Sequence, residues 1–311
     1  MDKIVSAATG GRLHLRPFRA FSSLVRIDVA ARSHVGHVRA NNEDHFFVTK
    51  LVRSLETTLS SLQPGDVPDR AEEVNYVMVV ADGMGGHAAG EVASRMVIRT
   101  LVHLALDVPD WIFKVEEDGT PEIERRARHI VEQVGAFLFE QGQNDAELHG
   151  MGSTLTAVRS YAHDLLVVHV GDSRAYLLRA RRLHRITKDH TMAQMLVDGG
   201  QLRASEVQAS RVRHVLTNAL GGASAEVKVD VDLVRLENGD RLLLCTDGLT
   251  DLVDDETITR TLVEARTSND ASNALVQLAL DRGGRDNVTV IVAGYTLPDE
   301  PPSEAVTQPG D

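Results

Sequence analysis

Short apolar runs, rich in Val, Ile, Leu and Thr, recur along the chain and predict β-strands. Gly, Asp or Asn bounds these runs, which is typical of strand ends. The expected strands are residues 24–31, 45–50, 76–81, 155–161, 165–170, 175–179, 227–233, 241–245 and 288–295. The short polar link at residues 161–164 predicts a hairpin turn between two of them.

Three longer stretches repeat apolar residues at helical spacing instead. In residues 93–104, 123–138 and 271–279 the apolar positions fall on one face, which predicts amphipathic helices. The strands follow one another too closely for repeated strand-helix-strand units, and the hairpin favours antiparallel pairing. We therefore expect an α+β fold in which two antiparallel sheets pack together, with helices on their outer faces.

Residues 24–296 are expected to fold as one unit, because no long polar linker divides them. Residues 1–23 contain three arginines but lack the apolar region of a secretory signal, so we expect a flexible arm. The tail, residues 297–311, is rich in Pro, Glu, Ser and Gly, which predicts disorder. Residues 51–75 contain two prolines and a glycine, and we expect an elongated excursion between two strands there.

Composition narrows the partners that the protein can have. The 311 residues are 42% hydrophobic, which suffices for a full core, and their formal net charge is −12. Such an acidic protein is a poor partner for nucleic acid or an anionic membrane but is compatible with divalent cations. No apolar stretch reaches the ~20 residues that span a bilayer, and we expect a cytoplasmic protein. The single cysteine, Cys245, lies in an apolar run and is expected to be a buried core residue.

Acidic residues stand at the ends of four expected strands. Asp82, Asp172 and Asp247 follow apolar runs, and Asp286 comes just before one. In antiparallel sheets the end of one strand lies beside the start of its neighbour, so these acids can meet at one rim. Clustered carboxylates repel one another unless cations neutralise them, and oxygen ligands suit Mg²⁺ and Mn²⁺. The alternative is that the Asp-Gly pairs among them only mark turns.

Two further polar segments have candidate roles. Arg39 can hold a phosphate through a bidentate contact, and Glu43 and Asp44 can extend a metal site, unless these residues only form a solvated turn. The glycine-rich segment 82–87 precedes a helix and can bind an anion there, although it lacks the lysine and the spacing of a P-loop. A flexible turn with a helix cap is the alternative for this segment. The glycine after Asp82 allows a backbone carbonyl to approach an ion closely.

Six motifs occur in one order along the chain and together resemble a known family. They are Arg39 with Asn42-Glu43-Asp44, Asp82-Gly83-Met84-Gly85-Gly86-His87, Gly150-Met151-Gly152-Ser153-Thr154, Gly171-Asp172-Ser173-Arg174, Thr246-Asp247-Gly248 and Asp286-Asn287-Val288-Thr289. In this order they are similar to the metal-dependent protein phosphatases of type 2C in their bacterial form, over residues 25–296. The resemblance implies a four-layer αββα sandwich with a dinuclear Mn²⁺ or Mg²⁺ site at one end.

The same resemblance implies which residues hold the metals. Asp82 is expected to bridge the two core ions, and the Gly83 carbonyl is expected to bind one of them. Asp247 and Asp286 are expected to complete the ligands of the other core ion. Asp172, together with Asp247, is expected to help hold a third, weaker ion.

The resemblance also implies catalytic roles, and the sequence departs from the family in one of them. Arg39 is expected to bind the substrate phosphate, while Glu43 and Asp44 act mostly through waters on the metals. Many eukaryotic relatives have a histidine directly after the Asp-Gly pair, proposed as the general acid for the leaving group. Here Met84 takes that position, and His87, three residues further on, does not inherit the role.

Residues 187–220 match a mobile flap near the site of such phosphatases, and its two arginines near residue 212 can contact a phosphoprotein. The resemblance implies metal-dependent hydrolysis of phosphoserine and phosphothreonine on proteins by an activated water. The expected partners are phosphoproteins, namely Ser/Thr kinases and their targets. Two alternatives remain open, a catalytically weak phosphoprotein-binding regulatory module and a hydrolase of small phosphate esters on the same fold.

Overall fold

The computed structural model of the chain describes residues 25–63, 66–85, 89–107, 120–161 and 163–297. The expected arm at 1–23, residues 298–311 of the expected tail, and His87 lie outside these ranges. Leu297, the first residue of that tail, is buried, and its N–H donates to the side chain of Asn238 at 3.0 Å. The packed part of the chain therefore continues at least to Leu297.

One antiparallel sheet joins the start of the described chain to its end. The first strand along the chain pairs with the last strand along the chain over its full length, from Arg26 opposite Thr296 to His34 opposite Val288. In order across the sheet, the strands are β1 (Arg26–His34), β12 (Val288–Thr296), β11 (Arg241–Cys245), β7 (Arg174–Arg179) and β8 (Arg182–Arg185). The pairing of the first and last strands holds the two ends of the folded chain side by side.

The second sheet is larger and contains the longest strands. In order, its strands are β10 (Asp230–Arg235), β6 (Asp164–Val170), β5 (Leu155–Tyr161), β3 (Arg70–Met84), β4 (Gly152–Ser153) and β9 (Leu220–Gly221), with β2 (Asp44–Glu56) on the other edge of β3. Tyr161 stands opposite Asp164, which confirms the predicted hairpin between β5 and β6. All of its pairings are antiparallel.

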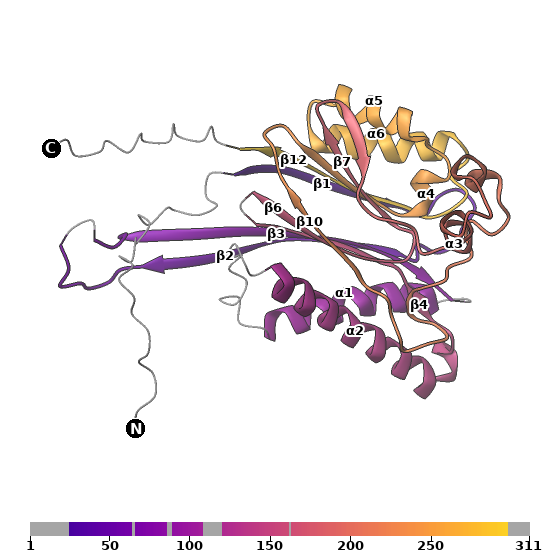
Figure 1. The fold of residues 1–311 in the computed structure, drawn as a ribbon, viewed down its shortest axis with the longest axis horizontal. Coiled ribbons are helices and arrows are strands. Elements are labelled where there is room, and N and C mark those ends of the chain that lie inside the picture. The colour runs from indigo at the N-terminus through magenta and orange to yellow at the C-terminus, as the bar shows by residue number, and fades with distance from the viewer. Residues whose placement is uncertain (1–24, 64–65, 86–88, 108–119, 162, 298–311) are drawn as a thin grey trace.

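Helices cover the outer face of each sheet, and three apolar clusters separate the four layers (Figure 1). The outer clusters pack helices on the sheets, and the third, which includes Met78, Leu165 and Leu242, fills the space between the sheets. The helices are α1 (Ala89–Asp107) and α2 (Thr120–Asn144) on the larger sheet, and α5 (Asp255–Glu264) and α6 (Ser268–Asp281) on the smaller. This arrangement confirms the predicted α+β sandwich of two antiparallel sheets between helices.

The hydrophobic pattern did not predict several short strands and helices, because they are too short to show a periodicity. They are the strands β4, β8 and β9, the 3₁₀ helices η2 (Ala146–Leu148) and η3 (Ala204–Ala209), and the helices α3 (Met192–Asp198) and α4 (Asp247–Thr250). The helix α5 was not predicted either. Cys245 is fully buried in the cluster beneath α5 and α6, where burial raises the pKa of its thiol to about 12. The interpretation of this cysteine as a core residue is therefore confirmed.

The strand expected at residues 227–233 starts later than predicted, at Asp230. Its first residues are bonded elsewhere, because the side chain of Asn218 binds both backbone groups of Lys228. The Lys228 N–H donates to Asn218 Oδ1 at 3.0 Å, and Asn218 Nδ2 donates to the Lys228 carbonyl at 2.8 Å. A backbone whose donor and acceptor are both occupied cannot also join a sheet ladder there.

The excursion expected at residues 51–75 is for the most part a β-ribbon. β2 and β3 stay paired from Asp44 opposite Asp82 to Glu56 opposite Arg70, and only residues 57–69 lie outside the two strands. Figure 1 shows the paired strands projecting well beyond the body of the sandwich. Four large apolar side chains of this ribbon are more than half exposed, namely Val52, Leu55, Leu59 and Leu62.

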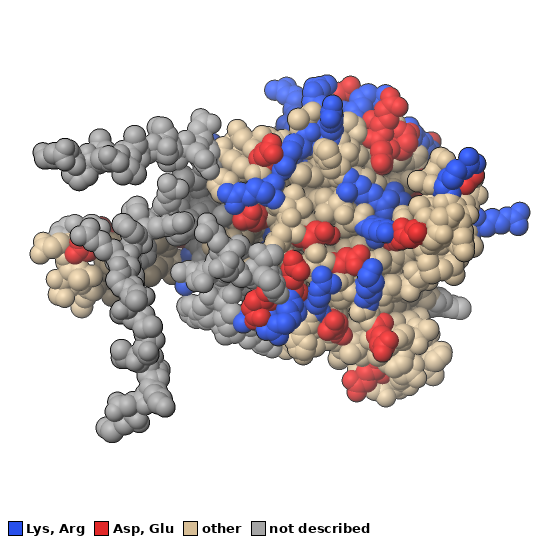
Figure 2. All heavy atoms as spheres, viewed as in Figure 1, with Lys and Arg blue, Asp and Glu red and all other residues tan. Residues whose placement is uncertain are grey.

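The surface charge is distributed without a single-sign region on the face seen in Figure 2, where basic and acidic side chains alternate. The net charge of −12 is therefore not concentrated on that face. Among the described helices, none combines the length and the apolar character that crossing a membrane requires.

Candidate metal and phosphate site

Five aspartates converge at the end of the sandwich where β2 begins and β3 ends. Asp44 is the first residue of β2 and stands directly opposite Asp82 in the pairing with β3. Asp172 lies in the turn between β6 and β7, and Asp247 begins α4 just after β11. Asp286 lies two residues before β12. The structure thus brings the strand-end acids together, as the antiparallel arrangement requires.

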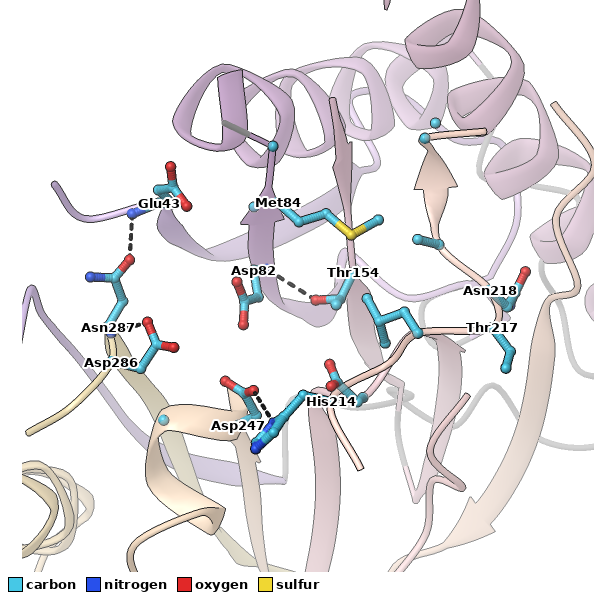
Figure 3. Close-up of a pocket in the computed structure, with 18 of the residues that line it drawn as sticks. Glu43, Asp82, Met84, Thr154, His214, Thr217, Asn218, Asp247, Asp286 and Asn287 are labelled. Carbon is cyan, nitrogen blue, oxygen red and sulfur yellow. Dashed lines mark hydrogen bonds and ion pairs between the residues drawn. The ribbon is translucent and has the colours of Figure 1, made fainter. Parts of the chain in front are cut away.

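These residues line a common cavity of about 900 Å³, apart from Asp44, which is only 4% exposed. The cavity walls also contain Arg39, Glu43 and Gly83. Asp44 is paired directly opposite Asp82, so the structure brings these candidate residues to one end of the sandwich. In the close-up of Figure 3, the carboxylates of Glu43, Asp82, Asp247 and Asp286 surround a shared space.

The glycines of the two Asp-Gly pairs are needed for close approach of backbone segments. A Cβ atom on Gly83 would lie 2.0 Å from the carbonyl oxygen of Gly90, which lies in the first turn of α1. A Cβ atom on Gly248 would lie 1.9 Å from the carbonyl oxygen of Asn287. Any larger residue would push apart the segments that carry Asp82, Asp247 and Asp286, so these pairs do more than mark turns.

The carboxylates disfavour one another's charge. Desolvation, followed by the charges of Asp44 and Asp247, raises the pKa of Asp82 well above its usual value. Desolvation, followed by the charge of Asp247, likewise raises the pKa of Asp172. Asp44 has its pKa raised to about 7 by burial, in spite of the hydroxyl groups bonded to it. A divalent cation removes this repulsion, because it favours the ionised form of every nearby carboxylate.

The donor atoms also fit a hard cation. Thr246 Oγ1 donates to Asp44 Oδ2 at 2.8 Å, but Asp44 Oδ1 is buried without a hydrogen-bond partner in the described part of the chain. A buried carboxylate oxygen without a partner is costly unless a cation or an ordered water binds it. The cavity otherwise offers carboxylate and carbonyl oxygens, which are the ligands that Mg²⁺ and Mn²⁺ prefer.

Arg39 lies at the rim of this acidic floor. Its Nη2 donates to Asp286 Oδ2 at 2.7 Å, and its side chain is still 52% exposed. The hydrogen bond to Asp286 and the charge of that residue raise the pKa of the guanidinium. Arg39 is therefore a permanently charged, accessible group whose planar donors suit phosphate oxygens.

Asn287 fixes the position of the segment that carries Glu43. The motif Asp286-Asn287-Val288-Thr289 did not by itself predict this role. Its Oδ1 accepts the Glu43 N–H at 2.7 Å. Its Nδ2 donates to the carbonyls of Val35 and Asn41, both at 2.9 Å. Asn287 thereby links the loop before β2 to the start of β12, next to Asp286.

His214 and Asp251 also belong to the site, and the sequence missed both. His214 Nδ1 lies 3.6 Å from Asp247 Oδ2, and its Nε2 lies 3.3 Å from Asp251 Oδ2. The contact with Asp247 raises the pKa of the His214 imidazole. The four-residue spacing between Asp247 and Asp251 is a signal that could have found Asp251, because it places both on one side of a helical turn. His214 comes from the 187–220 segment, which has no periodicity to indicate its position.

Known proteins resemble the chain in sequence. The family model described as "Protein phosphatase 2C" matches residues 69–280. The serine/threonine protein phosphatase PstP of Mycobacterium tuberculosis is 39% identical over 264 residues, which are 85% of this chain. The chain spans only 44% of the length of that relative. The serine/threonine phosphatase stp of Listeria monocytogenes is 33% identical over 221 residues, which are 71% of this chain and 85% of the relative.

Solved structures resemble its fold. The M. tuberculosis serine/threonine phosphatase PstP/Ppp superposes with a TM-score of 0.69 at 38% identity, over 87% of this chain and 99% of the other. The catalytic domain of PstP in complex with two manganese ions gives a TM-score of 0.67 at 37% identity, over 88% and 99% of the two chains. Since the family model covers more than half of the chain and this likeness extends over nearly all of the described fold, the chain belongs to the protein phosphatase 2C family.

Proposed function

We propose that this chain hydrolyses phosphoserine and phosphothreonine on proteins in a reaction that depends on Mn²⁺ or Mg²⁺. The observation that carries the proposal is the cavity in which Asp82, Asp247 and Asp286 surround a shared space with Arg39 at its rim. Family membership and the relatives' names support the reaction class.

Two core ions would be held by Asp82, the Gly83 carbonyl, Asp247 and Asp286, and a weaker third ion by Asp172 with Asp247. Bound there, divalent cations lower the pKa of a water molecule and offset the negative charge on phosphoryl oxygens. The raised pKa values of Asp82 and Asp172 support this ligand set. Asp44 Oδ1, which is buried and has no hydrogen-bond partner among the described residues, can bind a water beside the ions.

The protein's own groups bind and orient the substrate. Arg39 offers its guanidinium to the phosphate, and its bond to Asp286 keeps it beside the acidic floor. Glu43 is fixed by the hydrogen bond from its N–H to Asn287, and Asp44 by the Thr246 hydroxyl. Met84 lines the cavity and has no proton to give, so the leaving oxygen receives its proton from another group or from water.

The decisive experiment is a turnover assay on phosphothreonine and phosphotyrosine peptides, and on nucleotides, with and without added Mn²⁺. We expect metal-dependent hydrolysis with the phosphothreonine peptide preferred. Faster turnover of nucleotides would favour the alternative of a small-phosphoester hydrolase. Binding of the peptide without turnover at any Mn²⁺ concentration would favour the regulatory module and contradict the proposal.

The biological setting follows the same proposal. We infer that the substrates include Ser/Thr kinases and their targets, and that the protein acts in the cytoplasm. Residues 187–220 are proposed as a flap over the cavity, since Arg213 and His214 line it. The flap is supported by the contact of His214 with Asp247 and Asp251.

A further inference from the structure

His190 lies behind one wall of the active-site cavity. A second cavity of about 850 Å³, lined by His190 itself, shares Thr217 and Asn218 with the first. These two residues therefore form part of the partition between the cavities. Figure 3 shows them on the side of the active-site cavity that lies away from Glu43 and Asp286.

The backbone of His190 connects this wall to the turn that carries Asp172. Its N–H donates to the carbonyl of Gly171 at 2.7 Å, and its carbonyl accepts the N–H of Thr217 at 2.9 Å. Both bonds are made by main-chain atoms, so replacing the side chain with one other than proline removes neither the donor nor the acceptor of His190.

The buried side chain of His190 adds three further bonds. Nδ1 receives the Gly171 N–H at 3.2 Å and lies 2.7 Å from Asn218 Nδ2, while Nε2 lies 3.0 Å from Asp230 Oδ2. A ring nitrogen that accepts from a backbone N–H carries no proton, so the Gly171 N–H and the Asn218 amide both point at Nδ1 and share its one lone pair. The proton is then on Nε2 and is donated to Asp230, which fixes the tautomer of His190.

Gly171 in turn is packed against Thr154, which lies between β4 and β5 and is hydrogen-bonded to Asp82. A Cβ atom on Gly171, which has a φ of +108°, would lie 2.6 Å from the Thr154 side chain. Thr154 Oγ1 accepts the Asp82 N–H at 3.0 Å, and the Thr154 N–H donates to the Asp82 carbonyl at 2.9 Å. A continuous set of contacts therefore runs from Asp82 to Asn218 through Thr154, Gly171 and His190.

We propose that His190 is a positioning residue that fixes the cavity wall at Thr217 and Asn218 relative to the metal floor, and so determines how a phosphopeptide is held. This inference rests on the proposed function. A small aryl phosphate needs only the acidic floor and Arg39, whereas a peptide around the phosphate extends to the walls of the 900 Å³ cavity. Displacement of the wall therefore affects the peptide more than the small substrate.

Two substitutions test the roles of the two ring nitrogens separately. In His190→Asn the amide oxygen can replace Nδ1 as the acceptor for Gly171 and Asn218. In His190→Gln the longer amide can replace Nε2 as the donor to Asp230, but the acceptor at Nδ1 is lost. The matched control is His184→Gln, because His184 on β8 is exposed.

The measured quantity is the ratio of kcat/KM for a phosphothreonine peptide to kcat/KM for an aryl phosphate. We expect His190→Gln to lower this ratio about tenfold, through KM for the peptide, which is the scale of one lost buried hydrogen bond. His190→Asn should recover most of the ratio, and His184→Gln should keep it. Asn218→Asp, which removes the donor to Nδ1, should lower the ratio as His190→Gln does.

An unchanged ratio in both His190→Gln and Asn218→Asp would overturn the proposal, as would equal losses on both substrates or a lower melting temperature with normal kinetics. Failure of the proposed function would look different, since the unmodified protein would then not turn over the peptide at all.

Discussion

The two ends of the β2–β3 hairpin have the same pairing but opposite environments. At one end Asp44 stands opposite Asp82 within the body of the sandwich, and at the other Glu56 stands opposite Arg70 in a projecting ribbon. The first end brings like charges together and the second pairs opposite charges. Apolar side chains differ as well, because Val80 beside the acids is fully buried while Leu55 in the ribbon is 53% exposed.

The comparison shows that pairing alone does not make a site. Like charges directly opposite each other destabilise a sheet, and desolvation increases the cost. The acidic end is maintained by neighbouring hydroxyl groups. Thr246 donates to the carboxylate of Asp44, and Thr154 accepts the backbone N–H of Asp82. A cation that binds there relieves a repulsion that the opposite end of the hairpin does not have.

Removing one carboxylate from the acidic end should have the largest effect. Asp82→Ala should lower aryl phosphate turnover by at least about 10³-fold, the scale expected when the main electrostatic stabilisation is lost. Turnover with Mn²⁺ and a calorimetric metal titration measure both parts of this prediction. The matched control is Asp69→Ala, since Asp69 is exposed between the two strands of the ribbon.

Asp69→Ala should keep full turnover and metal binding. If Asp82→Ala bound two ions with normal affinity, its assignment as the bridging ligand would be wrong.

Asp172→Ala should have a smaller effect than Asp82→Ala, because the third ion is proposed to have few protein ligands. Mg²⁺ held mainly through waters is weakly bound and exchanges readily. We expect turnover of a phosphoprotein to fall by about ten- to a hundredfold, the range of one electrostatic contact, with the two core ions retained.

The competing explanation is that Asp172 only shapes the turn after Gly171. It predicts a lower melting temperature with near-normal specific activity, so a thermal melt beside the rate assay separates the two.

Arg39→Ala should raise KM more than it lowers kcat. A phosphate clamp that acts equally in the ground and transition states contributes uniform binding, and we expect KM to rise about tenfold. Arg39→Lys keeps the charge without the bidentate geometry and should recover only part of the loss. Steady-state kinetics on a phosphopeptide provide both constants. A steep fall in kcat at unchanged KM would mean that Arg39 acts mainly on the transition state.

The strand-end acids and the sandwich could be predicted because Asp and Gly interrupt long apolar runs at the rim. His214 could not be placed, since residues 187–220 lack a repeating pattern and their position depends on contacts with distant segments. Asn218 shows the same difficulty. Its side chain bonds the backbone of Lys228, so the strand that the apolar pattern predicted from residue 227 starts only at Asp230. The ribbon was missed because its strands 51–56 and 70–75 adjoin a turn with prolines and a glycine, which hid their pairing.

The acidic end should also make the metal-free protein sensitive to pH. Burial raises the pKa of Asp44 to about 7, above its usual value near 4 in an unfolded chain. Between these values the folded protein binds more protons than the unfolded chain, so raising the pH lowers the free energy of unfolding. In EDTA we expect the melting temperature to fall by a few degrees from about pH 5.5 to about pH 8, and Mn²⁺ to abolish most of the fall.

Asp44→Asn, which cannot ionise, should weaken the pH dependence in EDTA. A melting temperature that rises with pH in EDTA would contradict the raised pKa of Asp44.

Shortening the ribbon should have the smallest effect. Replacing residues 53–73 with Asn-Gly joins Val52 to Val74, which already stand opposite each other, through a two-residue turn that suits a hairpin. The removed residues lie at the end of the hairpin that is far from Asp82. Several of their apolar side chains are exposed, so little packing is lost. We expect kcat/KM for an aryl phosphate to stay within about twofold and the melting temperature to change by only a few degrees. A loss of more than tenfold in kcat/KM would mean that the two ends of the hairpin are coupled, because the ribbon would then help to hold Asp44 opposite Asp82.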